Sequence, residues 1–137
     1  MAVPEGKRTE SQLAFQTKAI ELLEYTTTIC NNNNIFPKRD RWIVANRIVD
    51  CAFTILECVF EANDVYVSTY DDYLERRKIQ QKAKHSTSKL LAHIEFAYNK
   101  YKIEGKRIEH WTRLVVEERR LILKWMKSDK DRFKNLK

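Results

Sequence analysis

The chain has 137 residues, of which only two are glycine and two proline, and a formal net charge of +7. This length suits one domain with its own core, covering residues 1–137, and so few turn-forming residues favour a small number of long helices. Because no apolar run reaches about 18 residues and the N-terminus lacks the apolar segment of a signal peptide, we expect a cytoplasmic protein that does not contact a membrane.

The first predicted helix covers about residues 10–30. Thr9 and Gln12 have the spacing of a capping box at its start, and the polar residues 1–9 should fray. Its apolar residues form one seam at near-heptad spacing: Leu13, Ile20, Leu23, Thr27 and Cys30. Adjacent residues make this apolar face wider: Phe15, Ala19, Leu22 and Tyr25. The asparagines at 31–34 then predict a loop, because asparagine tolerates the left-handed backbone at a helix end.

The second predicted helix begins after Pro37 and extends to about Asp64. Proline suits a first helical turn because that turn leaves its N–H groups unpaired in any case. Small and branched residues then recur at alternating steps of three and four, at Ala45, Ile48, Ala52, Ile55, Val59 and Ala62. The strip beside this seam is apolar as well (Val44, Val49, Phe53, Leu56 and Phe60). So wide an apolar face predicts the central helix of a bundle, with more than one neighbour.

The third predicted helix, about residues 71–102, is the longest. Ser68 or Thr69 should cap its start, and Gly105 should belong to the cap at its end. Its second half has core character, whereas its first half is rich in bases. The steps of four, three and four between them place Lys78, Lys82, His85 and Lys89 on one face, flanked by Arg76, Arg77 and Lys84.

The fourth predicted helix covers about residues 106–127, with a seam at Ile108, Trp111, Val115, Ile122 and Trp125. Glu118 interrupts this seam. Because an unpaired buried carboxylate is costly, Glu118 should either turn to the bundle edge beside Arg119 or be buried and paired. Residues from about 129 to 137 are polar and should form a frayed tail. The four segments together predict an all-α bundle.

The charge of the chain is unevenly distributed. Between Trp42 and Val65 one base stands against four acids, whereas ten bases stand against three acids between Glu75 and Arg107. Further bases at Lys38, Arg39 and Arg41 lie at a helix N-terminus, where the helix dipole disfavours cations but attracts phosphate. Concentrated basic charge is typical of proteins that bind polyanions, although a solvated helix face can carry the same pattern.

No catalytic or cofactor-binding motif stands out. Two glycines are too few for a glycine-rich phosphate loop, and no histidine has the Glu-x-x-His spacing of a di-iron bundle. Cys30, Cys51 and Cys58 lack companions at metal-ligand spacing, which favours free core thiols in a reducing compartment. We therefore expect that the protein is not an enzyme and that it binds no cofactor and no metal. An enzyme would require carboxylates such as Glu117 and Glu118 to meet in a cleft with shifted pKa values.

Two groups of residues resemble a known family of small helical proteins. The first comprises Phe36-Pro37-Lys38, Arg41, Ala45-Asn46-Arg47-Ile48, Leu56-Glu57 and Glu61-Ala62-Asn63; the second comprises His110-Trp111, Leu114, Glu118, Leu121 and Trp125-Met126-Lys127-Ser128. The first group is similar to the second helix of ribosomal-RNA intervening-sequence proteins and of the accessory variability protein of diversity-generating retroelements, and the second group resembles the last helix of the accessory-protein branch. The resemblance covers most of residues 36–128 and favours the accessory-protein branch.

This resemblance implies a four-helix up-and-down bundle that assembles as a ring-like homopentamer. Proteins of that branch are basic, bind nucleic acid, and act with the retroelement's reverse transcriptase while a template RNA is copied. The residues that match basic positions of the family's second helix are Lys38, Arg41 and Arg47.

Charge and resemblance together predict a nucleic-acid interface of Lys38, Arg39, Arg41, Arg76, Arg77, Lys78, Lys82, Lys84 and Lys89. Arg47, the single base of an otherwise acidic segment, should instead pair with Asp50 or with a neighbouring subunit. The predicted function is a non-catalytic accessory protein that binds RNA or DNA and a reverse transcriptase. The alternative is a structural protein-interaction bundle, similar to the intervening-sequence proteins, whose basic face docks an acidic partner protein.

Overall fold

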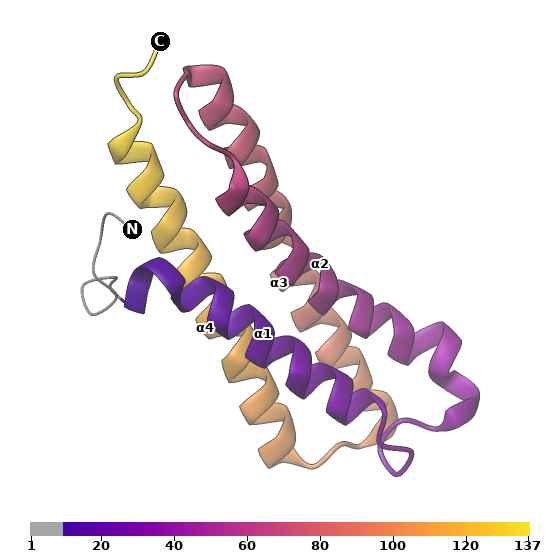
Figure 1. The fold of residues 1–137 in the computed structure, drawn as a ribbon. Helices are drawn as coiled ribbons and strands as arrows, with labels where there is room; N and C mark the ends of the chain where they lie inside the picture. Colours follow the sequence, from indigo (N-terminus) through magenta and orange to yellow (C-terminus); the bar gives the residue numbers. More distant parts are fainter. Residues whose placement is uncertain (1–9) are drawn as a thin grey trace.

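Apolar residues at helical spacing form four long helices: α1 (Glu10–Cys30), α2 (Asn46–Asp64), α3 (Tyr70–Tyr101) and α4 (Gly105–Arg132). The computed structural model describes residues 10–137, with side chains from residue 14 onward, so the predicted cap at Thr9 lies outside the described residues. No strand occurs in this range, and successive helices alternate in direction (Figure 1). The predicted four-helix up-and-down bundle is confirmed.

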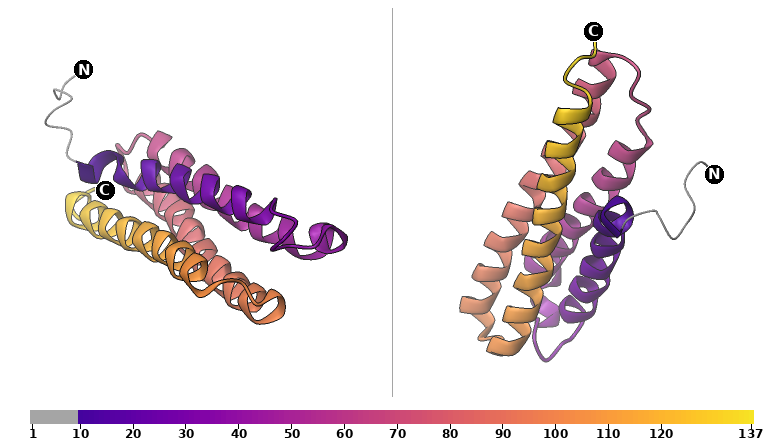
Figure 2. Two further views of the ribbon diagram at one scale, coloured as in Figure 1. Left: turned by 90° about the horizontal axis from the view of Figure 1, so that it is seen from below. Right: turned by 90° about the vertical axis from the view of Figure 1, so that its left-hand side faces the viewer.

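Each helix packs against two others around the bundle. Helix α2 contacts α1 and α3, and α4 contacts the same two helices (Figure 2). The chain's last residue lies at the end of the bundle where α3 begins, because the backbone N–H of Tyr70 donates to the carbonyl of Lys137 at 3.1 Å. Of the helices described, none is both long and apolar enough to cross a membrane.

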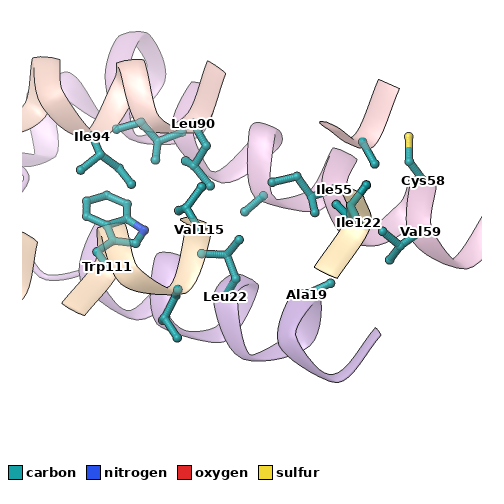
Figure 3. Close-up of a cluster of buried hydrophobic side chains, with 14 of the residues drawn as sticks. Ala19, Leu22, Ile55, Cys58, Val59, Leu90, Ile94, Trp111, Val115 and Ile122 are labelled. Carbon is teal, nitrogen blue, oxygen red and sulfur yellow. The ribbon is translucent and has the colours of Figure 1, made fainter. Parts of the chain in front are cut away.

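The core is formed by the seam that the sequence predicts for α2. Its members, from Ala45 through Ile48, Ala52, Ile55 and Val59 to Ala62, are all buried. Figure 3 shows side chains of all four helices in this core, with Ile55 and Val59 close to Ile122 at one end and Ile94 close to Trp111 at the other. The other labelled members include Ala19 and Leu22 of α1, Leu90 of α3 and Val115 of α4. Full burial of one such large apolar side chain stabilises the fold by about 1.5–3 kcal/mol.

The seam of α1 differs from the predicted one by a small rotation of the helix. The buried residues are Phe15, Ala19, Leu22, Thr26, Ile29 and Cys30, so Cys30 of the predicted seam is buried, whereas Ile20 is 43% exposed. Two contacts explain the rotation. Phe15 stacks on Trp125 with ring centroids 4.0 Å apart, and the indole N–H of Trp111 donates to the Thr26 hydroxyl at 3.0 Å. Partners on α4 therefore select which of two adjacent stripes faces inward.

The chain enters α2 through two irregular turns instead of one continuous helix. Lys38–Asp40 forms a 3₁₀ turn (η2) and Arg41–Ala45 a π-helical turn (η3), after which α2 runs to Asp64 as predicted. The segment is tied to the end of α3, because the Tyr101 hydroxyl donates to the Asp40 carboxylate at 2.7 Å and Phe36 packs edge-on against the Tyr101 ring. A π turn shifts side-chain register, and here Trp42 and Ile43 are left exposed.

The ends of α3 are set by local chemistry that the sequence predicts only in part. Thr69 is the N-cap, and it forms a capping box with Asp72, as expected of this position. At the other end the prediction for Gly105 is wrong, because Lys102 adopts the left-handed conformation (φ 51°) that closes the helix. Gly105 is instead the first residue of α4, preceded by Glu104.

Helix α4 continues beyond the predicted boundary and ends at Arg132, so the first part of the predicted tail is helical. Its extra turn is fixed by Asp129, which is buried and pairs with Arg76 of α3 at 2.8 Å. A frayed tail was expected because these residues are polar. The buried ion pair supplies the anchor that apolar residues would otherwise provide.

Candidate nucleic-acid interface

The bases predicted to share a face of α3 line one side of a groove between α2 and α3. We call Lys78, Lys82, His85 and Lys89 the basic row; all four are exposed. Together with Asp50, Cys51 and Thr54 of α2 they line an open hollow of about 700 Å³. The spacing of four, three and four therefore predicts their common orientation correctly.

The lysines of the basic row are electrostatically available. None of the ion pairs formed between residues 14 and 137 includes Lys78, Lys82 or Lys89. Among the residues that line this hollow, Asp50 is the single carboxylate. The groove therefore presents excess positive charge to solvent, as a surface for a polyanion requires.

A second hollow of about 570 Å³ lies beside the π turn, and helical spacing puts its α3 residues on the same face as the basic row, past Lys89. We call it the apolar hollow; it is lined by Ile43, Val44, Ala92 and Phe96 together with Arg47, His93 and Lys100. Arg47 is exposed and forms no ion pair with Asp50, so the expected pair within the chain is absent from the part described. Burial and the positive charge of Arg47 lower the pKa of His93.

Arg76 does not belong to the exposed interface that its sequence position suggests. Arg76 is only 8% exposed. Its Nη2 donates to Asp129 Oδ1 at 3.3 Å, and its Nε lies 2.8 Å from Asp129 Oδ2. Its guanidinium also lies over the Trp125 ring, 5.1 Å from the centroid. Gln80 and Arg132 donate to the same carboxylate. Arg76 is therefore corrected from a candidate phosphate ligand to part of a buried polar cluster.

Arg77 and Lys84 face the other side of α3, toward α4. Both are half-buried, and Arg77 donates to the backbone carbonyl of Met126 at 2.7 Å. They line a hollow of about 450 Å³ that also contains Lys127 and Lys130 of α4. The predicted α3 bases are thus divided between two surfaces, with the basic row on one and this pair on the other.

The three bases before α2 lie at the end of the bundle near Tyr101. Lys38 and Arg39 are exposed, whereas Arg41 is half-buried and its Nη2 lies 3.4 Å from the Asn33 side-chain oxygen, to which it donates. The neighbouring carboxylate of Asp40 already accepts the Tyr101 hydroxyl. Lys38 and Arg39 therefore remain as exposed charges close to the π turn, and Arg41 also holds the asparagine loop.

The two carboxylates that an enzyme would need have different environments. Glu117 is at the surface, where its hydrogen bond to Arg120 lowers its pKa. Glu118 is fully buried with neither oxygen hydrogen-bonded, and burial raises its pKa to about 9. Both sequence alternatives for Glu118 are therefore wrong, since it is buried and unpaired. Arg119 instead donates to the backbone carbonyl of Lys84 and to the hydroxyls of Thr87 and Ser88 on α3.

The cysteines and histidines form no assembled ligand set. Cys30, Cys51 and Cys58 are free thiols, and burial raises the pKa of each. Within the described part of the chain, no three His, Cys, Asp or Glu side chains are close enough to hold a metal ion.

Several residues of these surfaces were not predicted from the sequence. Phe96 and Lys100 lie in the second half of α3, which the sequence predicts to have core character, and Lys130 lies in the predicted tail. One signal for Arg76 was present. Counting back from Ala97 at steps of three and four gives the buried face of α3: Ile94, Leu90, Thr87, Ala83, Gln80, Arg76 and Tyr73. Because Thr87, Gln80 and Arg76 on this face are polar, hydrophobicity alone does not mark the face as buried.

Comparison with known proteins gave no relative: no family model, no curated protein and no solved structure matches the chain.

Proposed function

We propose that this protein is a non-catalytic accessory protein that binds RNA or DNA, acts with the reverse transcriptase of a diversity-generating retroelement, and resides in the cytoplasm. The observation that carries nucleic-acid binding is the basic row, whose three lysines are exposed and outside the ion pairs of the described chain. The sequence resemblance described above supports the reverse transcriptase as partner.

The binding mode follows from the side chains available. Lysines are flexible point charges, so they contact phosphates without reading base sequence. The basic row has no deep enclosed pocket, and its hollow is open to solvent along α2 and α3. Affinity for a long polymer is therefore gained by adding several weak contacts, and it should depend strongly on salt.

Assembly into a ring-like homopentamer is part of the proposal, because it would repeat the groove and multiply weak contacts. One observation on α2 supports self-association. Phe53 and Phe60 are 42% and 39% exposed on one stripe of the helix. Exposed aromatic residues of this kind are typical of protein interfaces.

We predict that light scattering after gel filtration will give about five times the chain mass of 16.4 kDa. The Phe53→Gln/Phe60→Gln variant should give a smaller assembly, because both substitutions remove apolar contact area without adding charge. A matched control is Leu74→Gln, which removes an equally exposed apolar side chain from α3. A wild-type protein that elutes as a 16.4 kDa monomer would contradict the pentamer.

The nucleic-acid proposal is tested by removing the basic row. Lys78→Ala/Lys82→Ala/Lys89→Ala should weaken binding to a fluorescent RNA by about tenfold or more, measured by anisotropy at about 50 mM salt. The matched control is Lys106→Ala/Lys124→Ala/Lys134→Ala, which removes the same charge from exposed positions outside the groove. If both variants lose the same affinity, net charge rather than the groove is responsible.

The alternative function is a protein-interaction bundle whose basic surface docks an acidic partner protein. The apolar hollow favours it, because a partner peptide could also fill this hollow. The two functions differ in one simple experiment. Partners captured from a lysate through a protein surface should remain bound after nuclease treatment, whereas partners bridged by RNA or DNA should be released.

A further inference from the structure

The α2–α3 groove has two chemically different ends. One end is the basic row, and the other is the apolar hollow, one helical turn further along α3 from Lys89. The apolar hollow has an aromatic ring, Phe96, that is 50% exposed, and Ile43 opposite it is 64% exposed. Single exposed apolar side chains are common on this bundle, but these two line one hollow together with Arg47 and Lys100, which makes it a candidate ligand surface.

The exposure of Ile43 follows from the backbone. The π turn at Arg41–Ala45 directs Val44 and Ala45 into the core and leaves Trp42 and Ile43 outside, with Trp42 80% exposed. Turns of this type within helices often occur at functional sites. The turn is held by the Tyr101–Asp40 hydrogen bond and by Phe36, so it is a packed feature and not a frayed end.

The charged residues that line the apolar hollow are both cations, Arg47 and Lys100. His93 is the one other titratable lining residue, and no carboxylate is among them. An apolar surface that also has cationic lining residues fits a ligand that combines a flat apolar face with negative charge. An unpaired nucleotide has this chemistry, because its base has a π face and its phosphate is an anion.

We infer that the α2–α3 groove binds single-stranded nucleic acid, with a base placed against Phe96 and Ile43 in the apolar hollow and phosphates along the basic row. This inference rests on the proposed nucleic-acid function and specifies its substrate. A duplex can place phosphates along the basic row but cannot fill the apolar hollow, because its bases are stacked inside.

The dimensions of the groove suit a short strand. Lys78 and Lys100 are 22 positions apart on one helix, which corresponds to about 33 Å at about 1.5 Å per residue. That length holds about ten stacked nucleotides at about 3.4 Å each, and fewer if the strand is extended. Proteins that bind single strands combine such a basic track with aromatic platforms over about 4–16 nucleotides.

The test compares a single-stranded ten-nucleotide RNA with a blunt-ended ten-base-pair RNA duplex, at equal phosphate concentration, using the wild type, Phe96→Ala and Tyr98→Ala. Tyr98 is also an exposed aromatic of α3, 43% exposed, but it does not line the groove. We expect the wild type to prefer the single strand. Phe96→Ala should weaken single-strand binding by about tenfold and leave duplex binding unchanged, and Tyr98→Ala should change neither.

Each outcome distinguishes this inference from the proposed function. Equal binding of both RNAs, unchanged in Phe96→Ala, would overturn the inference and leave nucleic-acid binding through the basic row intact. If the wild-type protein binds neither RNA, the proposed function itself is overturned. If neither RNA requires Phe96 but an acidic amphipathic peptide binds and Phe96→Ala abolishes that binding, the apolar hollow is a protein-docking site and the inference is wrong.

Discussion

At pH 8, the Glu118→Gln variant is expected to have a higher free energy of unfolding than the wild-type protein, by on the order of 3–5 kcal/mol. The difference should shrink steadily as the pH falls and should nearly vanish near pH 4.5. Urea unfolding followed by circular dichroism at several pH values measures it directly.

The reason is the position of Glu118 in the core of the bundle. The side chain is fully buried with neither oxygen hydrogen-bonded, and burial, with a smaller contribution from Glu117, raises its pKa to about 9 from the ordinary value of 4.5. Lys18 of α1 opposes this only weakly. The native carboxyl is therefore protonated at neutral pH, although it ionises in the unfolded chain.

The sign of the pH dependence follows from proton counting. Below about pH 4.5 both states are protonated at Glu118, and the residue makes no pH-dependent difference. Between about pH 4.5 and 9 only the native state holds the proton, so stability is lost at about 1.4 kcal/mol per pH unit. Glutamine has nearly the same shape and cannot ionise, so the variant lacks this loss.

Glu117→Gln is the matched control for this prediction, since it makes the same change one residue away at the surface. Its pKa is lowered, chiefly by the hydrogen bond to Arg120, so its removal should not raise stability at pH 8. Parallel pH profiles for Glu118→Gln and the wild type would contradict an unpaired, protonated Glu118.

Removal of the Asp129 carboxylate should destabilise the bundle more than removal of any surface acid. Asp129→Ala is expected to cost about 3–5 kcal/mol, because it leaves Arg76 as a buried cation without a counter-charge. It also removes the acceptor of the Gln80 amide, which donates to Asp129 at 2.8 Å. Burial lowers the pKa of Arg76, and the Asp129 charge opposes that shift.

Two further variants define this effect. Glu104→Ala breaks an exposed ion pair to Arg107 and should cost less than about 1 kcal/mol. The double variant Arg76→Met/Asp129→Leu should recover much of the stability that Asp129→Ala loses, because a buried apolar pair carries no desolvation cost. A loss below about 1 kcal/mol for Asp129→Ala would show that Arg76 escapes to solvent.

The helical framework was largely predictable because it depends on local patterns. The end of α1 follows from the asparagines at 31–34, the buried seam of α2 from apolar spacing, and the Thr69 cap from side-chain chemistry. The failures have tertiary causes. The π turn is held by Tyr101 of another helix, and the extra turn of α4 is held by Arg76, 53 positions away from Asp129.

The candidate interface was predictable as a charge pattern but not as a surface. Helical spacing placed the basic row on one face, yet it could not show that Asp50 and Thr54 stand opposite. It could not show either that Phe96 meets Ile43 across the groove. Both depend on how α2 and α3 are aligned along each other, which the core packing decides.

The most direct test of the account is the salt dependence of RNA binding by the wild type and by Lys78→Ala/Lys82→Ala/Lys89→Ala. We expect wild-type affinity to fall steeply between about 50 and 200 mM salt, because three phosphate contacts alone account for about 20-fold over this range. In the variant, the slope of log affinity against log salt should be less steep by about two. An identical slope in both proteins, or no binding by the wild type at about 50 mM salt, would contradict the α2–α3 groove as the nucleic-acid interface.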